Sequence, residues 1–301
     1  MTVPTKYTFV KNELIDLSFT ATLDPGVDTD FPFSNAYSNH PGRVFKFSGI
    51  ASTAIILFDF GVSPQAFNAI GVINHNIPTG YEMHIQANAT DDWSDPSVEE
   101  TITHREISTC KLFDNSTRYR YWRFRIREAG GFILDGGVGA AIPDASLLAP
   151  DDDAGTFGSG EGVGETIVTI GELVLGSVIE APINPEYGDV QKTRYQNRRQ
   201  ESEYGSPIVY PIQPVESLEM SWEPSLTDAQ LATIEDFWND RKGDAKPFMM
   251  VPDPGTTWHP TSHATVCYFG FFVEFAPRKI FYNVNALRAR FEEFPNGKYL
   301  T

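Results

Sequence analysis

The chain has 301 residues, a formal net charge of −17 and 41% hydrophobic residues, with 21 Pro and 24 Gly. Its length is enough for two ordinary domains, and the many Pro and Gly residues favour turns over long helices, so the composition predicts a mainly β chain. Residues 1–180 carry 11 Lys and Arg against 24 Asp and Glu, and residues 181–301 carry 12 against 16. Such an acidic chain lacks the positive charge that binding to phosphate backbones requires, which argues against specific nucleic-acid binding.

No run of residues reaches the apolar length of a membrane span, and residues 1–17 lack the features of a signal peptide. We therefore expect a protein without a membrane span that is made in the cytoplasm without a signal peptide. Cys110 and Cys267 fall in separate predicted domains, and we expect two unpaired, reduced thiols.

Short strand patterns separated by turn residues fill most of the first 180 residues. Residues 118–127 (RYRYWRFRIR) alternate strictly, which predicts a half-buried strand with Trp122, Phe124 and Ile126 facing a core. The other patterns are Arg43–Ser48, Ala54–Phe60, Phe67–Ile73, Glu82–Ala89 and Ile167–Leu175.

The order of these strands resembles the galactose-binding-like jelly-roll sandwich of discoidin type over about residues 40–178. The residues that carry the resemblance are Phe58–Gly61, Ala69–Ile77, Tyr121–Ile126 and Ile170–Gly176. It implies a jelly-roll β-sandwich for residues 1–180, but such sandwiches serve many functions. Residues 130–165 are expected to form a long loop with an acidic, Gly-rich tip.

The C-terminal part, residues 207–301, is expected to be a smaller β domain that carries one amphipathic helix, Thr227–Lys242. Thr227 and Gln230 have the spacing of a capping box, and Gly243 is placed to end the helix in the left-handed conformation. Trp238 continues the apolar face of this helix, so we expect its ring to be buried against a sheet.

Two stretches of this part resemble minor tail and distal tail proteins of long-tailed bacteriophages: Phe237–Pro254 (FWNDRKGDAKPFMMVPDP) and Ala286–Pro295 (ALRARFEEFP). The resemblance covers about the last third of the chain. It implies a structural component of the virion tail, a subunit of a tail-tip or baseplate ring (a hexamer or trimer) that contacts other tail proteins and displays the jelly roll outward. In the resembled distal tail proteins the ring-forming domain usually comes first, whereas here it comes second.

Residues 181–206 are polar, and two interpretations are open: a solvated linker, or an arm that packs on a neighbouring subunit. The aromatic residues favour the arm, because they are costly on a purely solvated tether. The candidate interface residues are Tyr187, Arg194, Tyr195, Arg198, Arg199 and Tyr204.

Residues of catalytic or metal-binding type occur without the spacing that such sites require. Asp151–Asp153 are followed by Gly155 where a calcium loop needs a ligand, and Asp253, His259 and His263 do not form a zinc motif. No nucleophile signature is present. The sequence therefore predicts no catalytic, metal or cofactor site, and a protein that is not an enzyme.

Aromatic residues on sandwich loops can form sugar-binding platforms, because their rings stack on the apolar faces of pyranosides. The candidate glycan contacts are Asn74, His75, Asn76, Tyr81 and Trp93. They support the alternative function, a carbohydrate-binding protein that recognises host-surface glycans. A glycan-degrading enzyme is a third reading, for which no pair of carboxylates stands out.

Overall fold

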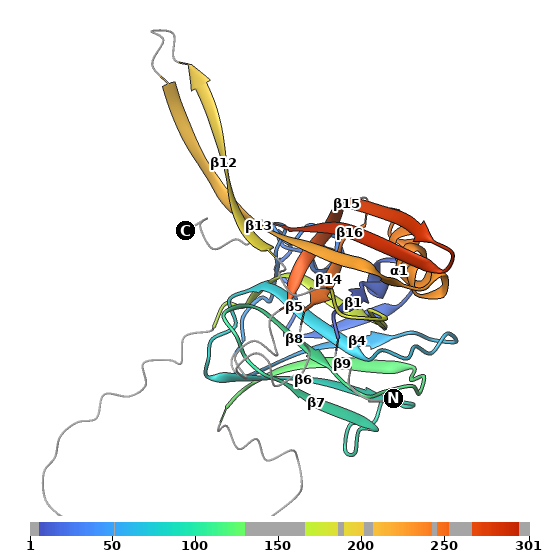
Figure 1. Ribbon diagram of the computed structural model, residues 1–301. Helices are drawn as coiled ribbons and strands as arrows, with labels where there is room; N and C mark the ends of the chain where they lie inside the picture. The colour runs from blue at the N-terminus through green and yellow to red at the C-terminus, as the bar shows by residue number, and fades with distance from the viewer. Residues whose placement is uncertain are drawn as a thin grey trace, which may run out of the picture.

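The computed structural model describes residues 6–50, 52–129, 166–185, 190–201, 207–242, 246–252 and 267–294. Within these residues the protein is mainly β, with three antiparallel sheets, one α-helix and two short 3-10 helices, which confirms the predicted fold class (Figure 1). None of the helices described is both long and apolar enough to cross a membrane.

Two of the sheets form a jelly-roll-type sandwich from strands that lie between Thr20 and Gly176. The five-stranded sheet has the order β2 (Thr20–Asp24), β4 (Thr53–Asp59), β9 (Tyr121–Glu128), β6 (Tyr81–Asn88) and β7 (Val98–Ile102). The four-stranded sheet has the order β3 (Phe45–Lys46), β10 (Thr169–Gly176), β5 (Ala69–His75) and β8 (Ile107–Leu112).

The core between these two sheets follows from the alternation of the strands. Trp122, Phe124 and Ile126 on β9 are fully buried, as the sequence predicts, and they meet Phe58 of β4 and other apolar residues in one cluster. The 3-10 helix η2 (Phe33–Tyr37) adds Phe33 and Ala36 to the same cluster. A second 3-10 helix, η1 (Glu13–Ile15), follows the first strand of the chain.

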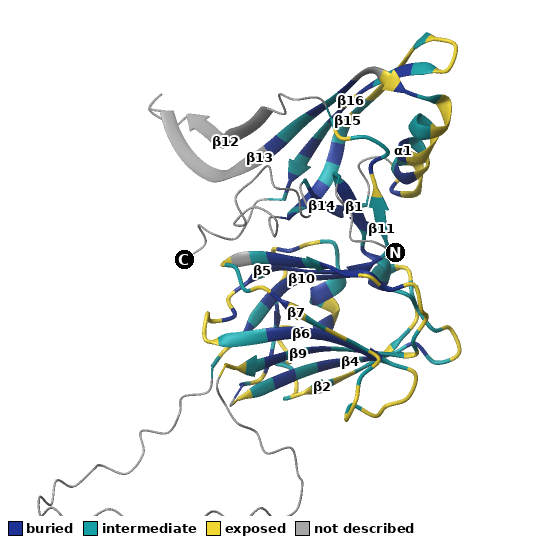
Figure 2. Cartoon of the chain, turned by 60° about the horizontal axis from the view of Figure 1, so that its bottom comes forward, coloured by how far each residue is buried: buried dark blue, intermediate teal, exposed yellow. Residues whose placement is uncertain are grey.

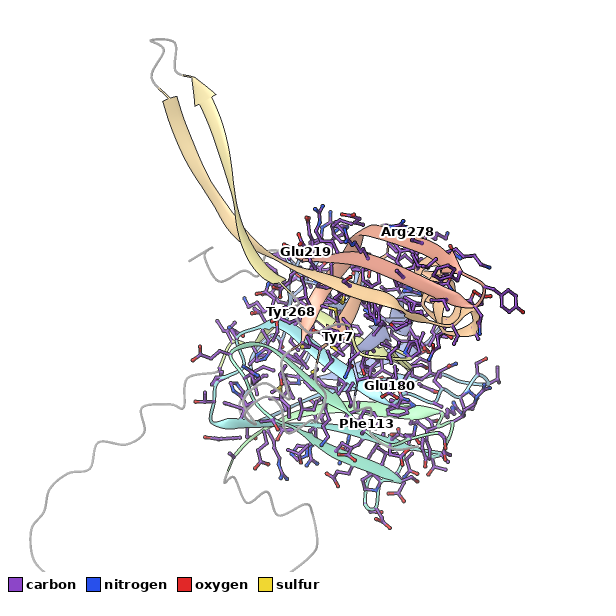
Figure 3. All side chains as sticks on the ribbon, viewed as in Figure 1. Tyr7, Phe113, Glu180, Glu219, Tyr268 and Arg278 are labelled. Carbon is purple, nitrogen blue, oxygen red and sulfur yellow. The ribbon has the colours of Figure 1, made fainter. Side chains whose placement is uncertain are left out.

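The third sheet has seven strands and carries the helix α1 (Asp228–Asp240) on one face. Its order is β11 (Val178–Glu180), β1 (Thr8–Lys11), β14 (Phe248–Val251), β15 (Tyr268–Phe281), β16 (Val284–Glu293), β13 (Pro207–Leu226) and β12 (Val190–Glu201). β15 runs from Tyr268, beside the sandwich, past Arg278 to the far end of this sheet (Figure 3).

The third sheet crosses the division that the sequence suggests near residue 180. β1 lies between β11 and β14, with Phe9 paired to Ile179 and to Met250. The chain thus leaves the third sheet after Lys11, forms the sandwich, and returns at Val178. Residues 1–180 are therefore not a separate unit, and the sandwich is an insertion between two adjacent strands.

Residues 181–206, for which the sequence leaves a solvated linker and an arm both open, contain a strand. Val190–Glu201 form β12, which pairs with β13 in a long hairpin. Figure 1 shows this hairpin projecting away from both the sandwich and the rest of the third sheet.

The four-stranded sheet is buried on both faces, so the three sheets stack in layers. One face meets the five-stranded sheet, and the other packs against the third sheet (Figure 2). The second contact is apolar, with Val10, Met249, Val251, Cys267 and Phe269 on the side of the third sheet and Ala69, Ile73, Cys110, Leu112 and Val174 on the side of the sandwich. This double burial explains why β5 and β10 are nearly continuous apolar runs.

Helix α1 begins as the sequence predicts. The side chain of Thr227 accepts a hydrogen bond from the backbone of Gln230, and the side chain of Gln230 accepts one from the backbone of Thr227. At the other end it is Lys242, with φ 55°, that adopts the left-handed conformation, and Gly243 lies outside the described residues.

The expectation that Trp238 is buried needs correction. Phe237 and Ile234 are the buried residues of α1, whereas Trp238 is only half-buried at the margin of their cluster. Its ring stacks on Phe275 of β15, with centroids 4.9 Å apart and planes inclined by 10°. The short helix points one face at the sheet, and Trp238 lies beside that face rather than on it.

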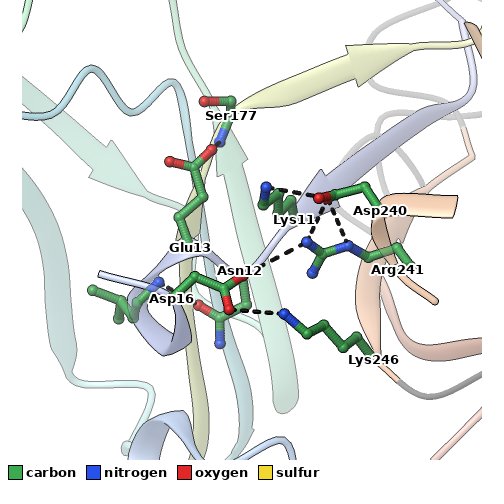
Figure 4. A network of polar contacts seen from close by, with 9 residues as sticks. Lys11, Asn12, Glu13, Asp16, Ser177, Asp240, Arg241 and Lys246 are labelled. Atoms are coloured by element: carbon green, nitrogen blue, oxygen red, sulfur yellow. Dashed lines mark hydrogen bonds and ion pairs between the residues drawn. The ribbon is translucent and has the colours of Figure 1, made fainter. Parts of the chain in front are cut away.

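A polar network joins the end of α1 to the segment that leads into the sandwich (Figure 4). Lys11 Nζ lies 3.1 Å from Asp240 Oδ2, and Lys246 Nζ lies 2.8 Å from Asp16 Oδ1. Arg241, which is 1% exposed, lies between these two ion pairs. The sandwich is thus fixed to the third sheet by charged contacts as well as by apolar packing.

Candidate functional site

Two of the predicted glycan contacts, Asn74 and Asn76, use their side-chain amides within the fold. Asn74, which has φ 52°, donates through Nδ2 to the carbonyl oxygen of Pro41 at 2.8 Å. Asn76 donates to the carbonyl oxygen of Ile167 at 3.1 Å and accepts from the backbone of Thr169 at 2.7 Å. These amides hold the end of β5 against neighbouring segments, and Nδ2 of Asn74 and both Nδ2 and Oδ1 of Asn76 are engaged in these contacts.

His75 lies between these two residues and is buried, with 6% of its surface exposed. Its Nδ1 accepts a hydrogen bond from the backbone of Ile77, and its ring lies 5.6 Å from that of His104. Burial, together with the nearby His104, lowers the pKa of His75 to about 4, so the ring is neutral at pH 7. The structure thus gives His75 a place in the core rather than on a sugar-binding surface.

Tyr81 and Trp93 lie at opposite ends of the sandwich. Tyr81 begins β6, and its hydroxyl is 3.2 Å from Thr166 Oγ1. Trp93 follows Asn88, the last residue of the same strand. Eight residues of strand span more than about 20 Å. Trp93 therefore lies apart from Tyr81, and the five predicted residues do not form one cluster.

The half-buried ring of Trp93 lies on the outer face of the five-stranded sheet. It covers the guanidinium group of Arg123, whose Cζ is 4.3 Å from the ring centroid. Its Nε1 donates to Asp91 Oδ1 at 2.7 Å, which fixes the orientation of the indole. An indole held in this way by a cation and a hydrogen bond presents its other face as a rigid apolar surface.

Polar side chains continue from Trp93 across this face. Arg123 Nε donates to Gln86 Oε1 at 2.8 Å, and Gln86 Nε2 donates to Glu99 Oε1 at 2.8 Å. We call Trp93, Arg123, Gln86 and Glu99 the Trp93 platform. The alternation of β9 places Arg123 on the outer face. Gln86, which bonds to Arg123, and Glu99, which bonds to Gln86, carry no sequence signal, because only the strand pairing brings them together.

A second group of interacting polar and charged side chains lies farther along the same sheet. Arg127 Nη2 is 2.7 Å from Glu82 Oε2, and His84 Nε2 is 3.4 Å from the same oxygen. Hydrogen bonds from Arg127 and His84 lower the pKa of the Glu82 carboxyl, so it stays ionised in weak acid. The outer face of the sandwich is therefore polar and charged, with Trp93 as an apolar surface at one end.

The predicted interface residues divide into two groups. Arg194, Tyr195, Arg198 and Arg199 lie in β12, whereas Tyr187 and Tyr204 lie outside the described residues. β12 pairs with β13 on one side and is the last strand of the third sheet as described. An edge strand presents backbone N–H and C=O groups to any strand that approaches it.

For metal sites, the described residues contain no group of three or more His, Cys, Asp or Glu side chains that could hold an ion. Asp151–Asp153, Asp253, His259 and His263, as well as the predicted loop at 130–165, lie outside the described residues. Within the part of the chain that the structure describes, no metal site is therefore added to those weighed from the sequence.

No protein-family model and no curated protein matches the sequence. Among solved structures, the chain is similar to the family 32 CBM from C. perfringens NanJ in complex with galactose (13% identity, 57% of this chain, 99% of that chain, TM-score 0.34). It is also similar to a chitosan-binding module of a chitosanase/glucanase from Paenibacillus sp. IK-5 (15% identity, 53% of this chain, 95% of that chain, TM-score 0.32). A third similar structure is a Ruminococcus gnavus GH29 fucosidase in complex with fucose (10% identity, 54% of this chain, TM-score 0.34). This chain spans only 26% of the fucosidase. Likenesses at these TM-scores carry no argument about function.

Proposed function

We propose that the protein is a structural subunit of a bacteriophage tail tip or baseplate, which assembles through its third sheet and holds the sandwich outward. The observation that carries the proposal is the β12–β13 hairpin, which extends the sheet away from the body of the molecule and ends it in an edge strand (Figure 1). Such an arm can reach a neighbouring copy and repeat around a ring.

The two stretches that resemble tail proteins support the same assignment. Residues 237–254 contain the end of α1 and β14, and residues 286–295 contain most of β16. Although they are far apart in sequence, both belong to the sheet that carries the hairpin. The proposed partners are copies of the same chain and other tail proteins, the proposed location is the virion tail, and no catalytic step is involved.

The way in which the sandwich is attached to the third sheet is also compatible with its outward display. It is inserted between β1 and β11, so two chain crossings and an apolar layer hold it against the third sheet. A module held in this way keeps a fixed direction relative to the sheet, whereas a module on a single linker would not.

The assembly can be tested by shortening the hairpin. Lys192 and Ser217 are paired, so replacing residues 193–216 by Asn-Gly leaves a two-residue hairpin turn at that position. Light scattering over a range of concentrations should show oligomers of the full chain and a monomer of the shortened variant. Tyr282→Ser, at the exposed β15–β16 turn, is the matched control and should assemble as the full chain does.

If the shortened variant oligomerises as readily as the full chain, the hairpin is not the element through which the protein assembles. A full chain that is monomeric at all concentrations, both alone and with purified tail proteins, and is absent from virions would exclude the tail assignment.

A second candidate function, glycan binding by the sandwich, is favoured by the Trp93 platform. The exposed side of the indole offers a surface for a pyranose ring, and Arg123 and Glu99, joined through the buried Gln86, supply hydrogen-bonding groups on the same face. Glycan-array binding by the wild type should fall at least about tenfold in Trp93→Ala, a change of about 1.4 kcal/mol, and should be unchanged in Tyr282→Ala. Equal binding by Trp93→Ala, or no retained glycan, would count against this function.

A further inference from the structure

Cys110 and Cys267 come from the two sides of the contact between the sandwich and the third sheet. Cys110 lies in β8, and Cys267 directly precedes β15. They are about half the chain apart in sequence, yet both belong to the apolar cluster between the sheets, with 3% and 6% of their surfaces exposed. Neither cysteine is in a disulfide, and the two side chains share a hydrogen bond.

The strand pairing explains why the two side chains meet. Cys110 is paired with Gly71 of β5, and a Cβ at Gly71 would collide with Met249 of β14. Glycine therefore lets the sheets approach closely at this position. Met249 is paired with Phe269 of β15, and Cys267, two residues before Phe269, points to the same side of the sheet.

From this arrangement we propose that Cys110 and Cys267 are a thiol–disulfide site that, on oxidation by a low-molecular-weight disulfide, crosslinks the sandwich to the third sheet. One cysteine thiolate attacks a sulfur of the oxidant and releases one small thiol. The second cysteine thiolate then attacks the mixed disulfide and releases the other small thiol. The protein loses two protons and two electrons, which together are two hydrogen atoms, and the oxidant takes them up to become two thiols.

The surroundings of the pair determine when this reaction proceeds. The hydrogen bond with Cys110, together with burial, raises the pKa of the Cys267 thiol well above its ordinary value, so the reactive thiolate is scarce in the closed state. Phe269 and Leu112 belong to the same apolar cluster, which a dissolved oxidant does not enter. The first attack therefore takes place when the contact between sandwich and sheet opens, and closure brings the second thiol to the mixed disulfide.

The proposal is tested on the full chain, reduced and then incubated with oxidised glutathione with and without a low urea concentration. Intact mass and peptide mapping under non-reducing conditions should show a monomer that has lost two hydrogen atoms, with the peptides of Cys110 and Cys267 joined. Crosslinking should be faster in low urea than in buffer, and dithiothreitol should reverse it. Because the closed loop is long, oxidation should raise the melting temperature by about 5–10 °C.

Cys110→Ser and Cys267→Ser serve as controls and should gain at most one glutathione each, without a rise in melting temperature. The proposal is overturned if the wild type, even after refolding in oxidised glutathione, retains two thiols, carries only mixed disulfides, or forms only disulfides between chains. The measurement on the wild type decides the question even where a variant fails to fold.

Discussion

Arg241, at the end of α1, and Asp16, at the start of the sandwich insertion, approach each other to 3.8 Å between Nη2 and Oδ2. The arginine is 1% exposed, and the same Nη2 lies 2.6 Å from Asp240. A buried guanidinium group with two carboxylates is stable only while its charge remains compensated. The pair therefore makes the position of the sandwich depend on the position of the helix.

Asp240→Asn should lower the free energy of unfolding by about 1–2 kcal/mol, because it removes the closer of the two carboxylates from Arg241 and a partner from Lys11. The carboxylate is half-exposed, which keeps the effect below that of a fully buried pair. Urea denaturation measures the change. Asp236→Asn removes the same charge from an exposed position of α1 and is the control. Equal effects of the two variants would show that the network does not stabilise the fold.

Gly176→Ala should destabilise the protein by about 3 kcal/mol, because a Cβ at this position would overlap the carbonyl oxygen of Lys11 in β1. Backbone cannot move aside as a flexible side chain can, so β1 and the end of β10 would have to separate. Gly80→Ala is the control, since a Cβ there meets nothing within 4 Å, and it should change stability by less than about 0.5 kcal/mol. A shift of the urea midpoint in the Gly80 variant but not in the Gly176 variant would contradict the close approach.

What the sequence predicts well in this chain is local. The capping box of Thr227 and Gln230 needs only residues three positions apart, and the alternation around Trp122 needs only one strand. The strand β1 could not be assigned from the sequence, because its four residues gain their place from β14 and β11, far along the chain.

The candidate sites show the same limit. Residue type suggested that His75 and Trp93 belong together, but type carries no information on which end of the sandwich a residue occupies. The strand pairing places Trp93 over Arg123 and places His75 in the core. Likewise, the closeness of Cys110 and Cys267 follows from the packing of two sheets and has no counterpart in their spacing.

Phe237→Ala and Trp238→Ala should differ in cost although the residues are adjacent on α1. Phe237 is 2% exposed and contacts the rings of Phe9 and Phe248, so its removal should cost about 3–5 kcal/mol. Trp238 is half-buried against Phe275, and its removal should cost about 1–2 kcal/mol. Denaturation of the two variants under identical conditions gives the comparison. If Trp238→Ala lowers the free energy of unfolding more than Phe237→Ala does, α1 faces the sheet with a different side from the one described.

Glu172 on β10 is the strongest candidate for a pH-dependent contribution to stability. It is fully buried, and its Oε1 accepts hydrogen bonds from Asn12 Nδ2 at 2.8 Å and from the backbone of Asn39 at 3.3 Å. Burial raises the pKa of its carboxyl from 4.5 to about 8, although these hydrogen bonds oppose the shift.

Between pH 4.5 and pH 8 the folded protein therefore holds a proton on Glu172 that the unfolded chain releases. The folded pKa is the higher one, so the resulting stability is fully present below about pH 4.5 and is lost as the pH rises through about 8. The loss is of order 3–5 kcal/mol.

Glu172→Gln keeps an acceptor oxygen beside Asn12 and carries no titratable proton. Its stability should be similar to that of the wild type at pH 5 and exceed it at pH 9, as urea midpoints at both values would measure. Glu106→Gln, at an exposed position, is the control and should follow the wild type at both pH values. If the wild type and Glu172→Gln instead lose stability in parallel between pH 5 and pH 9, the carboxyl of Glu172 is not the group that titrates, and the interior beside Asn12 accommodates its charge.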